Sequence, residues 1–189
     1  YSYIAVAALH NRDYAAAIEA YDKIDELDED MQDNYMKANY LRAAQLVRNG
    51  SYRKAVPCLK AAAYYSEKGS RFNQLSRYWL AESYYRNEDF ADSRELFTEL
   101  YNVSALYGEQ ESWLMPYNIA YCYFKESNYP AAKKWFAEYL EQPTVKYRKE
   151  ALERSADCSF ITKDYKAAAA EYTLVMKDYP DVNDVYPYY

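Results

Sequence analysis

The residue types that most often carry out chemistry in proteins are sparse in this sequence. It has one histidine, His10, and three cysteines, Cys58, Cys122 and Cys158, which form no CxxC pair. This set lacks the ligand spacing of a zinc site. The cysteines are better interpreted as small packing residues with free thiols, and His10 as a residue at a helix C-terminus, where a cation complements the dipole. We therefore predict no metal site.

The acidic run at residues 25–30 is a second candidate for chemistry. It lacks the central glycine and the terminal bidentate glutamate of a calcium loop, so a solvated loop is the better interpretation. The sequence also has no nucleophile elbow, no phosphate-binding glycine loop and no carboxylate pair at catalytic spacing. These observations predict a protein that is not an enzyme and that needs no cofactor.

Tyrosine, in contrast, is abundant, with 26 copies in 189 residues. Some of them stand in doublets such as Tyr64-Tyr65 and Tyr84-Tyr85, in which both rings cannot be buried in one core. Tyrosine offers a large contact area at a low cost in side-chain entropy, which suits recognition of a partner. A compositional bias of the lineage is the alternative interpretation, and the sequence leaves both open.

A motif that recurs five times indicates the elements that position these rings. Each copy has a polar turn, an aromatic residue and then small residues, and its aromatic stands at Tyr14, Tyr52, Phe90, Tyr129 and Tyr165. Such a period indicates a stack of identical units instead of one closed core. A residue able to cap a helix start precedes each aromatic. These residues are Asp13, Ser51, Asp89, Asn128 and Asp164.

Small residues at fixed spacing predict that each unit is a pair of closely packed antiparallel helices. The second helix has its small residue three positions after the aromatic, and the first helix has an alanine twelve positions earlier. The first-helix alanines are Ala5, Ala43, Ala81, Ala120 and Ala156. Their second-helix counterparts are Ala17, Ala55, Ser93, Ala132 and Ala168.

These patterns, clearest in Leu80-Ala81-x-x-Tyr84 and Ile119-Ala120-x-x-Tyr123, resemble the tetratricopeptide repeat. The resemblance extends over the whole chain. It implies an all-α fold, a right-handed α-α superhelix (solenoid) of about five helix pairs in a single array. The expected units are residues 1–33, 34–71, 72–110, 111–146 and 147–182, with 183–189 as the start of a further, truncated unit.

The resemblance also implies a function, a non-catalytic scaffold that binds a partner peptide or helix. In this family the first helix of each repeat lines a concave groove through fixed positions. Carried over to this sequence, they make an aromatic strip of candidate groove residues, namely Tyr40, Tyr78, Glu82, Tyr85, Tyr117, Tyr121, Phe124 and Phe160. The family's clamp for C-terminal carboxylates is not implied, because its positions hold Ser2 and Val6.

Two further functions remain open at this point, binding of glycan or peptidoglycan on tyrosine faces, and a purely architectural role in a larger cell-envelope protein. The repeats are longer than the family's ~34 residues, and residues 155–165 are similar to large Bacteroidetes-type repeat proteins. Both features favour a bacterial periplasm or outer-membrane-associated envelope.

Charge and hydropathy narrow the range of partners. The net charge of −6 argues against nucleic acid, which calls for a basic surface. No run approaches the ~18 apolar residues of a membrane helix. The chain begins and ends within repeat units, so we expect an internal segment of a longer protein whose uncapped ends favour self-association.

Overall fold

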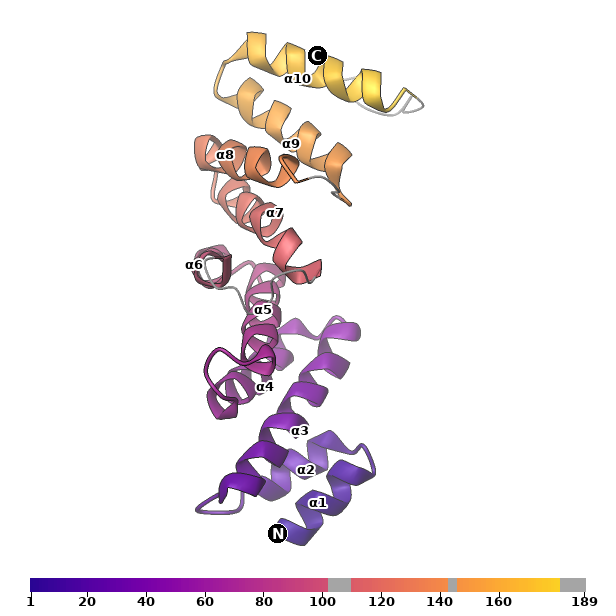
Figure 1. Ribbon diagram of the computed structural model, residues 1–189, viewed down its shortest axis with the longest axis vertical. Coiled ribbons are helices and arrows are strands. Elements are labelled where there is room, and N and C mark those ends of the chain that lie inside the picture. Colours follow the sequence, from indigo (N-terminus) through magenta and orange to yellow (C-terminus); the bar gives the residue numbers. More distant parts are fainter. Residues whose placement is uncertain (102–109, 143–145, 181–189) are drawn as a thin grey trace. The chain divides into compact units, whose positions relative to one another are not determined.

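The computed structural model describes residues 1–101, 110–142 and 146–180, and these residues form ten α-helices without a strand (Figure 1). The chain divides into two compact units, Tyr1–Tyr107 and Gly108–Tyr189, and each is described by itself. The expected truncated repeat at 183–189 lies outside the described residues. The helices of the first unit are α1 (Ser2–His10), α2 (Tyr14–Tyr21), α3 (Glu29–Arg48), α4 (Tyr52–Tyr65), α5 (Arg71–Arg86) and α6 (Phe90–Tyr101). Those of the second are α7 (Gln110–Lys125), α8 (Tyr129–Leu140), α9 (Arg148–Ile161) and α10 (Tyr165–Asp178).

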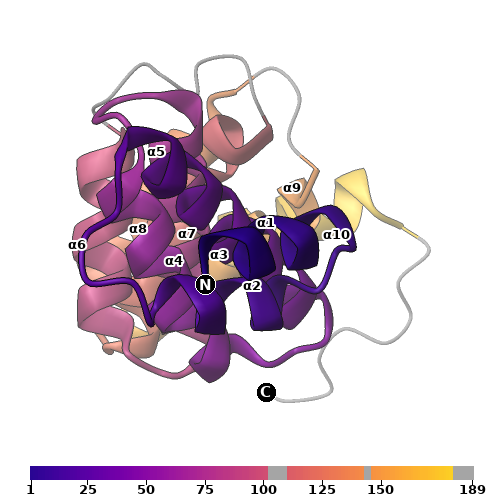
Figure 2. The ribbon, with the colours of Figure 1, turned by 90° about the horizontal axis from the view of Figure 1, so that it is seen from below.

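Helices that follow one another in the sequence pack against one another within each unit. In the first unit α1 packs on α2, α2 on α3, α3 on α4, α4 on α5 and α5 on α6; in the second, α7 packs on α8, α8 on α9 and α9 on α10. The pairing of α1 with α2 can be followed in Figures 1 and 2. This nearest-neighbour packing is typical of a solenoid, and the predicted all-α fold is confirmed.

The seam within each helix pair is built from the predicted small residues. All five first-helix alanines are fully buried, and their five second-helix counterparts are at most 2% exposed. In the third pair the seam also has a hydrogen bond, because the Ser93 hydroxyl donates to the Ala81 carbonyl at 2.8 Å. Small side chains let the two backbones approach, so the predicted register of the helix pairs is confirmed.

The turn between the two helices of a pair has the same backbone geometry in every copy. One residue adopts a left-handed conformation, with φ between 60° and 70°, and the amide of the next residue donates to a carbonyl of the first helix at 2.8–2.9 Å. This pattern is the Schellman motif, which satisfies the free carbonyls at a helix C-terminus. The left-handed residues are Arg12, Gly50, Glu88, Ser127 and Lys163.

The residue after the left-handed position is the predicted N-cap. Asp13, Asn128 and Asp164 accept the amide three residues ahead at 3.1, 3.4 and 3.1 Å respectively, as predicted. Ser51 is the N-cap residue of α4, but its side chain makes no cap hydrogen bond, so the prediction was wrong for this residue. In the acidic run, Asp28 accepts the Met31 amide at 2.8 Å and thereby caps α3. A short turn thus ends one helix and begins the next.

Large side chains fill the space around the alanine seams. In the first unit Leu46, Leu59 and Leu80 pack with Ala43 and Ala55. In the second unit a corresponding cluster joins α7, α8 and α9, with members Ala120, Ala132, Phe136, Tyr139, Ala151 and Cys158. The seams therefore hold the first helices of each unit at fixed spacing, and the candidate site lies on these helices.

Candidate functional site

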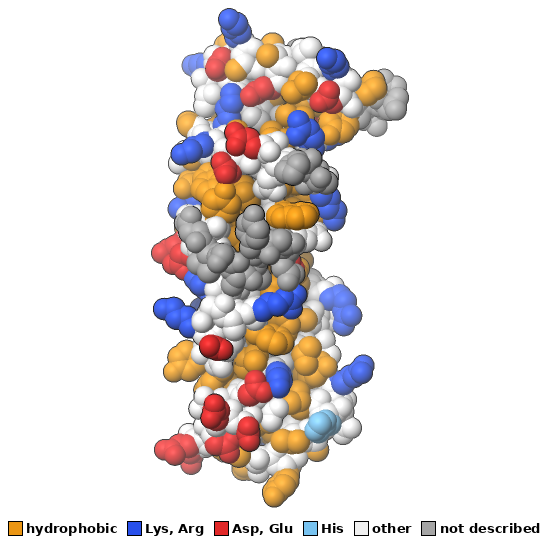
Figure 3. All heavy atoms as spheres, viewed as in Figure 1, with side chains coloured by type: hydrophobic (Ala, Val, Ile, Leu, Met, Phe, Trp, Pro, Cys, Tyr) orange, Lys and Arg blue, Asp and Glu red, His pale blue; other side chains and the backbone are white. Residues whose placement is uncertain are grey.

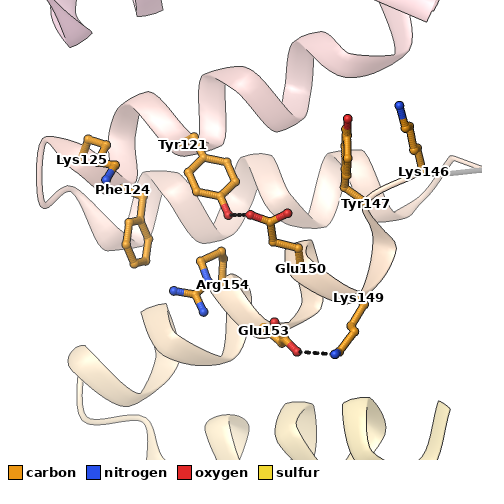
Figure 4. Close-up of a pocket in the computed structure, with 9 residues that line it drawn as sticks. All are labelled: Tyr121, Phe124, Lys125, Lys146, Tyr147, Lys149, Glu150, Glu153 and Arg154. Atoms are coloured by element: carbon orange, nitrogen blue, oxygen red, sulfur yellow. Dashed lines mark hydrogen bonds and ion pairs between the residues drawn. The ribbon is translucent and has the colours of Figure 1, made fainter. Parts of the chain in front are cut away.

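Each unit has a pocket between two successive first helices. The α3–α5 pocket of the first unit has a volume of about 290 Å³ and is lined by Tyr40, Ala43, Ala44, Val47, Arg48, Leu59 and Trp79. The α7–α9 pocket of the second unit has a volume of about 530 Å³ (Figure 4). Its lining residues are Tyr121, Phe124, Lys125, Lys146, Tyr147, Lys149, Glu150, Glu153 and Arg154.

The two pockets use equivalent positions of the repeat. Counted from the seam alanine, Ala44, Val47 and Arg48 of α3 correspond to Tyr121, Phe124 and Lys125 of α7. On the facing first helix, Trp79 and Arg154 both stand two residues before the seam alanine. The repeat therefore places a pocket at the same location in both units, with different side chains around it.

The α3–α5 pocket is mostly apolar. Trp79 and Val47 pack on the leucine cluster beneath the pocket, while Ala44 and Arg48 are exposed. The Tyr40 ring lies 5.3 Å from that of Phe72, which is 42% exposed. Aromatic pairs at this distance gain from edge-to-face contact. This pocket can accept an apolar side chain, and its one charged lining residue is Arg48.

The α7–α9 pocket combines aromatic and charged groups. The Tyr121 hydroxyl donates a hydrogen bond to Oε1 of Glu150, and Figure 4 shows both side chains directed toward each other from facing helices. Behind Tyr121, the Tyr117 ring lies 4.9 Å from it and stacks on Tyr147 at 5.1 Å. Burial and the hydrogen bond to Glu150 raise the pKa of Tyr121 and of Tyr117, so both stay neutral donors near neutral pH.

The charged groups of this pocket are partly paired. Lys149 Nζ lies 3.6 Å from Glu153 Oε1, a separation too long for a hydrogen bond, and Arg154 pairs with Asp157 at 2.8 Å. The Arg154 guanidinium also lies 5.9 Å from the Phe124 ring centroid, within cation–π range. The cations of the pocket can therefore bind an anion, and its carboxylates can accept a hydrogen bond from a donor. Its aromatic rings can pack against an apolar group.

Three of the predicted groove residues line these pockets, and a fourth supports one of them. Tyr40 lines the α3–α5 pocket, and Tyr121 and Phe124 line the α7–α9 pocket. Tyr117 is half-buried behind Tyr121 and packs on Phe136 and Tyr139.

Tyr78 requires a correction, because the prediction placed it on the exposed groove surface. It is only 4% exposed, and its ring packs against Trp79 and Phe97 at 5.5 and 5.4 Å. The fifth position of α5 turns toward the second helix of its pair, so this ring belongs to the core. The neighbouring Trp79 takes its place at the pocket.

Glu82, Tyr85 and Phe160 are half-buried and are not among the lining residues of these two pockets. Glu82 forms an ion pair with Arg86 at 2.8 Å. Tyr85 and Phe160 each contact the first aromatic of the following helix, Phe90 or Tyr165, at 5.4 and 5.5 Å. Part of the predicted aromatic strip therefore holds helix pairs together.

Five pocket residues were not predicted from the sequence, namely Trp79, Lys146, Tyr147, Lys149 and Arg154. Trp79 and Arg154 share one repeat position, two residues before the seam alanine, and this shared position was a usable signal. Lys146 and Tyr147 precede α9, where no repeat pattern assigns a face. The chemistry of the pocket therefore depends partly on residues outside the motif.

The cysteines, which could suggest catalysis or metal binding, lie in packing positions. All three cysteines are free thiols, and Cys122 and Cys158 are buried. Burial raises the pKa of Cys158 to about 12, which disfavours the reactive thiolate. Within residues 1–101, 110–142 and 146–180, no group of histidine, cysteine and carboxylate side chains could hold a metal ion. In the same residues no helix is both long and apolar enough to span a membrane.

Comparison with known sequences decides the family. The sequence profile described as tetratricopeptide repeat matches residues 1–33 and 40–110, more than half of the chain. The chain belongs to the tetratricopeptide repeat family. Tetratricopeptide repeats generally mediate protein–protein interaction, and their fold is typically a non-catalytic scaffold. No curated protein matches this sequence.

Two solved tetratricopeptide-like structures share the fold. One is a putative kinesin light chain of Podosopora anserina with nearly identical TPR-like repeats, and the other is a variant of that same protein. Their TM-scores are 0.63 and 0.62 at 14% and 13% identity, and each comparison covers 92% of this chain and 90% of the other. At such low identity the likeness concerns the fold alone.

Proposed function

We propose that this tetratricopeptide repeat array is a protein-interaction scaffold that holds a segment of a partner protein along its first helices. The observation that carries the proposal is the recurrence of an open pocket at equivalent repeat positions in both units. Concave sites with an apolar lining and a few polar groups are the usual places for ligands. The family's general role in protein–protein interaction supports a peptide as the ligand.

The surface around the pockets fits this role. Hydrophobic side chains reach the surface among Lys, Arg, Asp and Glu side chains in both units (Figure 3). Such a mixture provides apolar anchors with a polar rim, as interfaces between separately folded proteins do. Trp79 at the α3–α5 pocket and Phe124 at the α7–α9 pocket are the anchors that we assign to partner binding.

Selection from a displayed library of random peptides tests the proposal. The Ala44→Arg variant should lose peptides that the α3–α5 pocket retains, because Ala44 is exposed at the pocket and a long charged side chain would fill it. Ala91→Arg is the matched control, since Ala91 is also an exposed alanine and lies on the second helix α6 of the same unit.

The outcomes separate the proposed function from its alternatives. Selected peptides that bind wild-type protein and Ala91→Arg, but not Ala44→Arg, support a groove on the first helices. Equal binding by both variants would exclude the α3–α5 pocket as the site of the selected peptides. Retention of glycans on an array, with no peptide selected, would favour glycan recognition in the cell envelope, and no ligand of either kind would favour an architectural segment.

A further inference from the structure

The α7–α9 pocket has an excess of positive charge in a chain that is negative as a whole. Four cationic side chains line it, Lys125, Lys146, Lys149 and Arg154, against the carboxylates of Glu150 and Glu153. The chain carries a net charge of −6. Local charge of the opposite sign concentrates oppositely charged ligands and directs their approach.

Two of these cations remain available to a ligand. Lys149 and Arg154 have carboxylate partners in Glu153 and Asp157. Lys125 and Lys146 are exposed, and no carboxylate of the described residues pairs with either of them. Lys146 lines the pocket, and its Nζ lies 5.2 Å from the Tyr147 ring centroid.

One acceptor in the pocket is also incompletely satisfied. Glu153 is only 8% exposed, and its Oε1 atom makes no hydrogen bond, with Lys149 Nζ 3.6 Å away. A buried carboxylate oxygen in this state gains from a donor supplied by a ligand. A simple anion has no donor to offer, whereas an extended peptide presents backbone N–H groups along its length.

We propose that the α7–α9 pocket recognises an acidic segment of the partner protein, with Lys125 and Lys146 binding its carboxylates and Glu153 accepting a backbone N–H. Phe124 and Tyr147 pack against the apolar parts of the same segment. This inference rests on the proposed function, since it names the chemistry of the partner at one of the two pockets.

The test uses the whole chain and three sets of immobilised short peptides that differ only at two central positions, Glu-Glu, Gln-Gln or Lys-Lys, with the flanking positions randomised. Wild-type protein should bind the Glu-Glu set about tenfold better than the Gln-Gln set at low salt, and the difference should shrink with added salt. The double variant Lys125→Gln plus Lys146→Gln should remove most of this preference.

A matched control has the same change of charge outside the pocket. Lys134→Gln plus Lys166→Gln alters two exposed lysines of α8 and α10 in the same unit, and this variant should keep the preference. Because all four lysines are exposed, circular dichroism and the melting temperature should show that each variant folds like the wild type.

Each outcome decides between the two proposals. A preference for Lys-Lys peptides, equal binding of all three sets, or an equal loss in the control variant would overturn the acidic-segment inference while leaving peptide binding in place. If wild-type protein retains none of the three sets, the inference fails, and the display selection then decides the proposed function separately.

Discussion

The two pockets occupy the same positions of the repeat but differ in chemistry. In the first unit the pocket has Ala44, Val47 and Trp79 over a leucine cluster, whereas in the second the equivalent residues are Tyr121, Phe124 and Arg154. The backbone features beneath them, the buried alanine seam and the left-handed turn, are the same in both units. The repeat therefore determines where a pocket forms, and a few substitutions determine the chemistry of its lining.

Trp79 and Arg154 occupy the same repeat position, and the difference between them changes the contacts that each pocket makes with its neighbouring side chains. Trp79 completes an apolar cluster with Leu46, Leu59 and Leu80. Arg154 instead pairs with Asp157 at 2.8 Å and lies over the Phe124 ring. The arginine at this position thus has a carboxylate partner on its own helix, which the tryptophan of the first unit does not require.

The largest expected loss of stability comes from overpacking the buried alanine seam, which both units share. Ala81→Leu in the first unit and Ala120→Leu in the second should each destabilise the protein by roughly 1–3 kcal/mol or more, because both sites are fully buried between paired helices. Chemical denaturation of each variant measures the change. Unchanged stability in one unit would show that its seam is looser than that of the other.

The helix caps should distinguish individual repeats. Asp13→Ala and Asp164→Ala should each cost about 1 kcal/mol, because each variant leaves a helix-start amide without its acceptor. Ser51→Ala should cost clearly less, since the Ser51 side chain makes no cap hydrogen bond. Equal losses at all three sites, measured from urea midpoints, would contradict this ordering.

An effect of similar size is expected at one left-handed turn, and smaller effects at two others. Gly50 has φ of +70°, and an added Cβ would meet no atom within 4 Å. Gly50→Ala should therefore destabilise by backbone strain alone, by about 1 kcal/mol. Glu88→Gly and Ser127→Gly should relieve the same strain in the first and second unit, with a gain of a few tenths of a kcal/mol after the entropy cost of glycine. A loss of stability in both glycine variants would contradict this account.

Three partly buried tyrosines should lose their protons only in strongly alkaline solution, namely Tyr35 of the first unit and Tyr117 and Tyr121 of the second. Burial, followed by a hydrogen bond to Asp22, raises the pKa of Tyr35 to about 12, and burial also raises the pKa of Tyr117 and Tyr121. Unfolded tyrosine ionises near pH 10, so the unfolded chain releases these protons first. The stability from these residues should be fully present below about pH 10 and lost as pH rises further.

Absorbance titration of the phenolate and thermal melts across the alkaline range check this expectation. Tyr121→Phe should reduce the loss of stability above about pH 10, because phenylalanine cannot ionise. An unchanged alkaline loss in Tyr121→Phe would show that other groups dominate it.

The repeat made much of the fold predictable. Regular spacing identified the turns and the seam from Ala5 to Ala168. Every repeat of a solenoid has the same local structure, so the residue types that it requires recur at the same positions in each copy. The failed cap at Ser51 shows the limit of this reasoning, since the motif indicates which residue type can cap but not how its side chain is oriented.

The candidate site was less predictable than the fold. Tyr78 and Tyr40 hold the same repeat position, yet Tyr78 is buried against Phe97 while Tyr40 lines a pocket. The face that a ring covers depends on its neighbours on the next helix, and these neighbours vary between repeats. Lys146 and Tyr147 precede α9, in a segment without a periodic pattern, so the sequence alone could not assign them to a pocket.

The central claim is that partners bind along the first helices. Backbone NMR chemical-shift changes on addition of a selected peptide test this claim most directly, because they report every affected residue at once. The account predicts the largest changes at Ala44, Val47 and Trp79 for an apolar peptide, and at Phe124, Lys125 and Lys146 for an acidic one. Changes confined to the second helices α4, α6, α8 and α10 would contradict it.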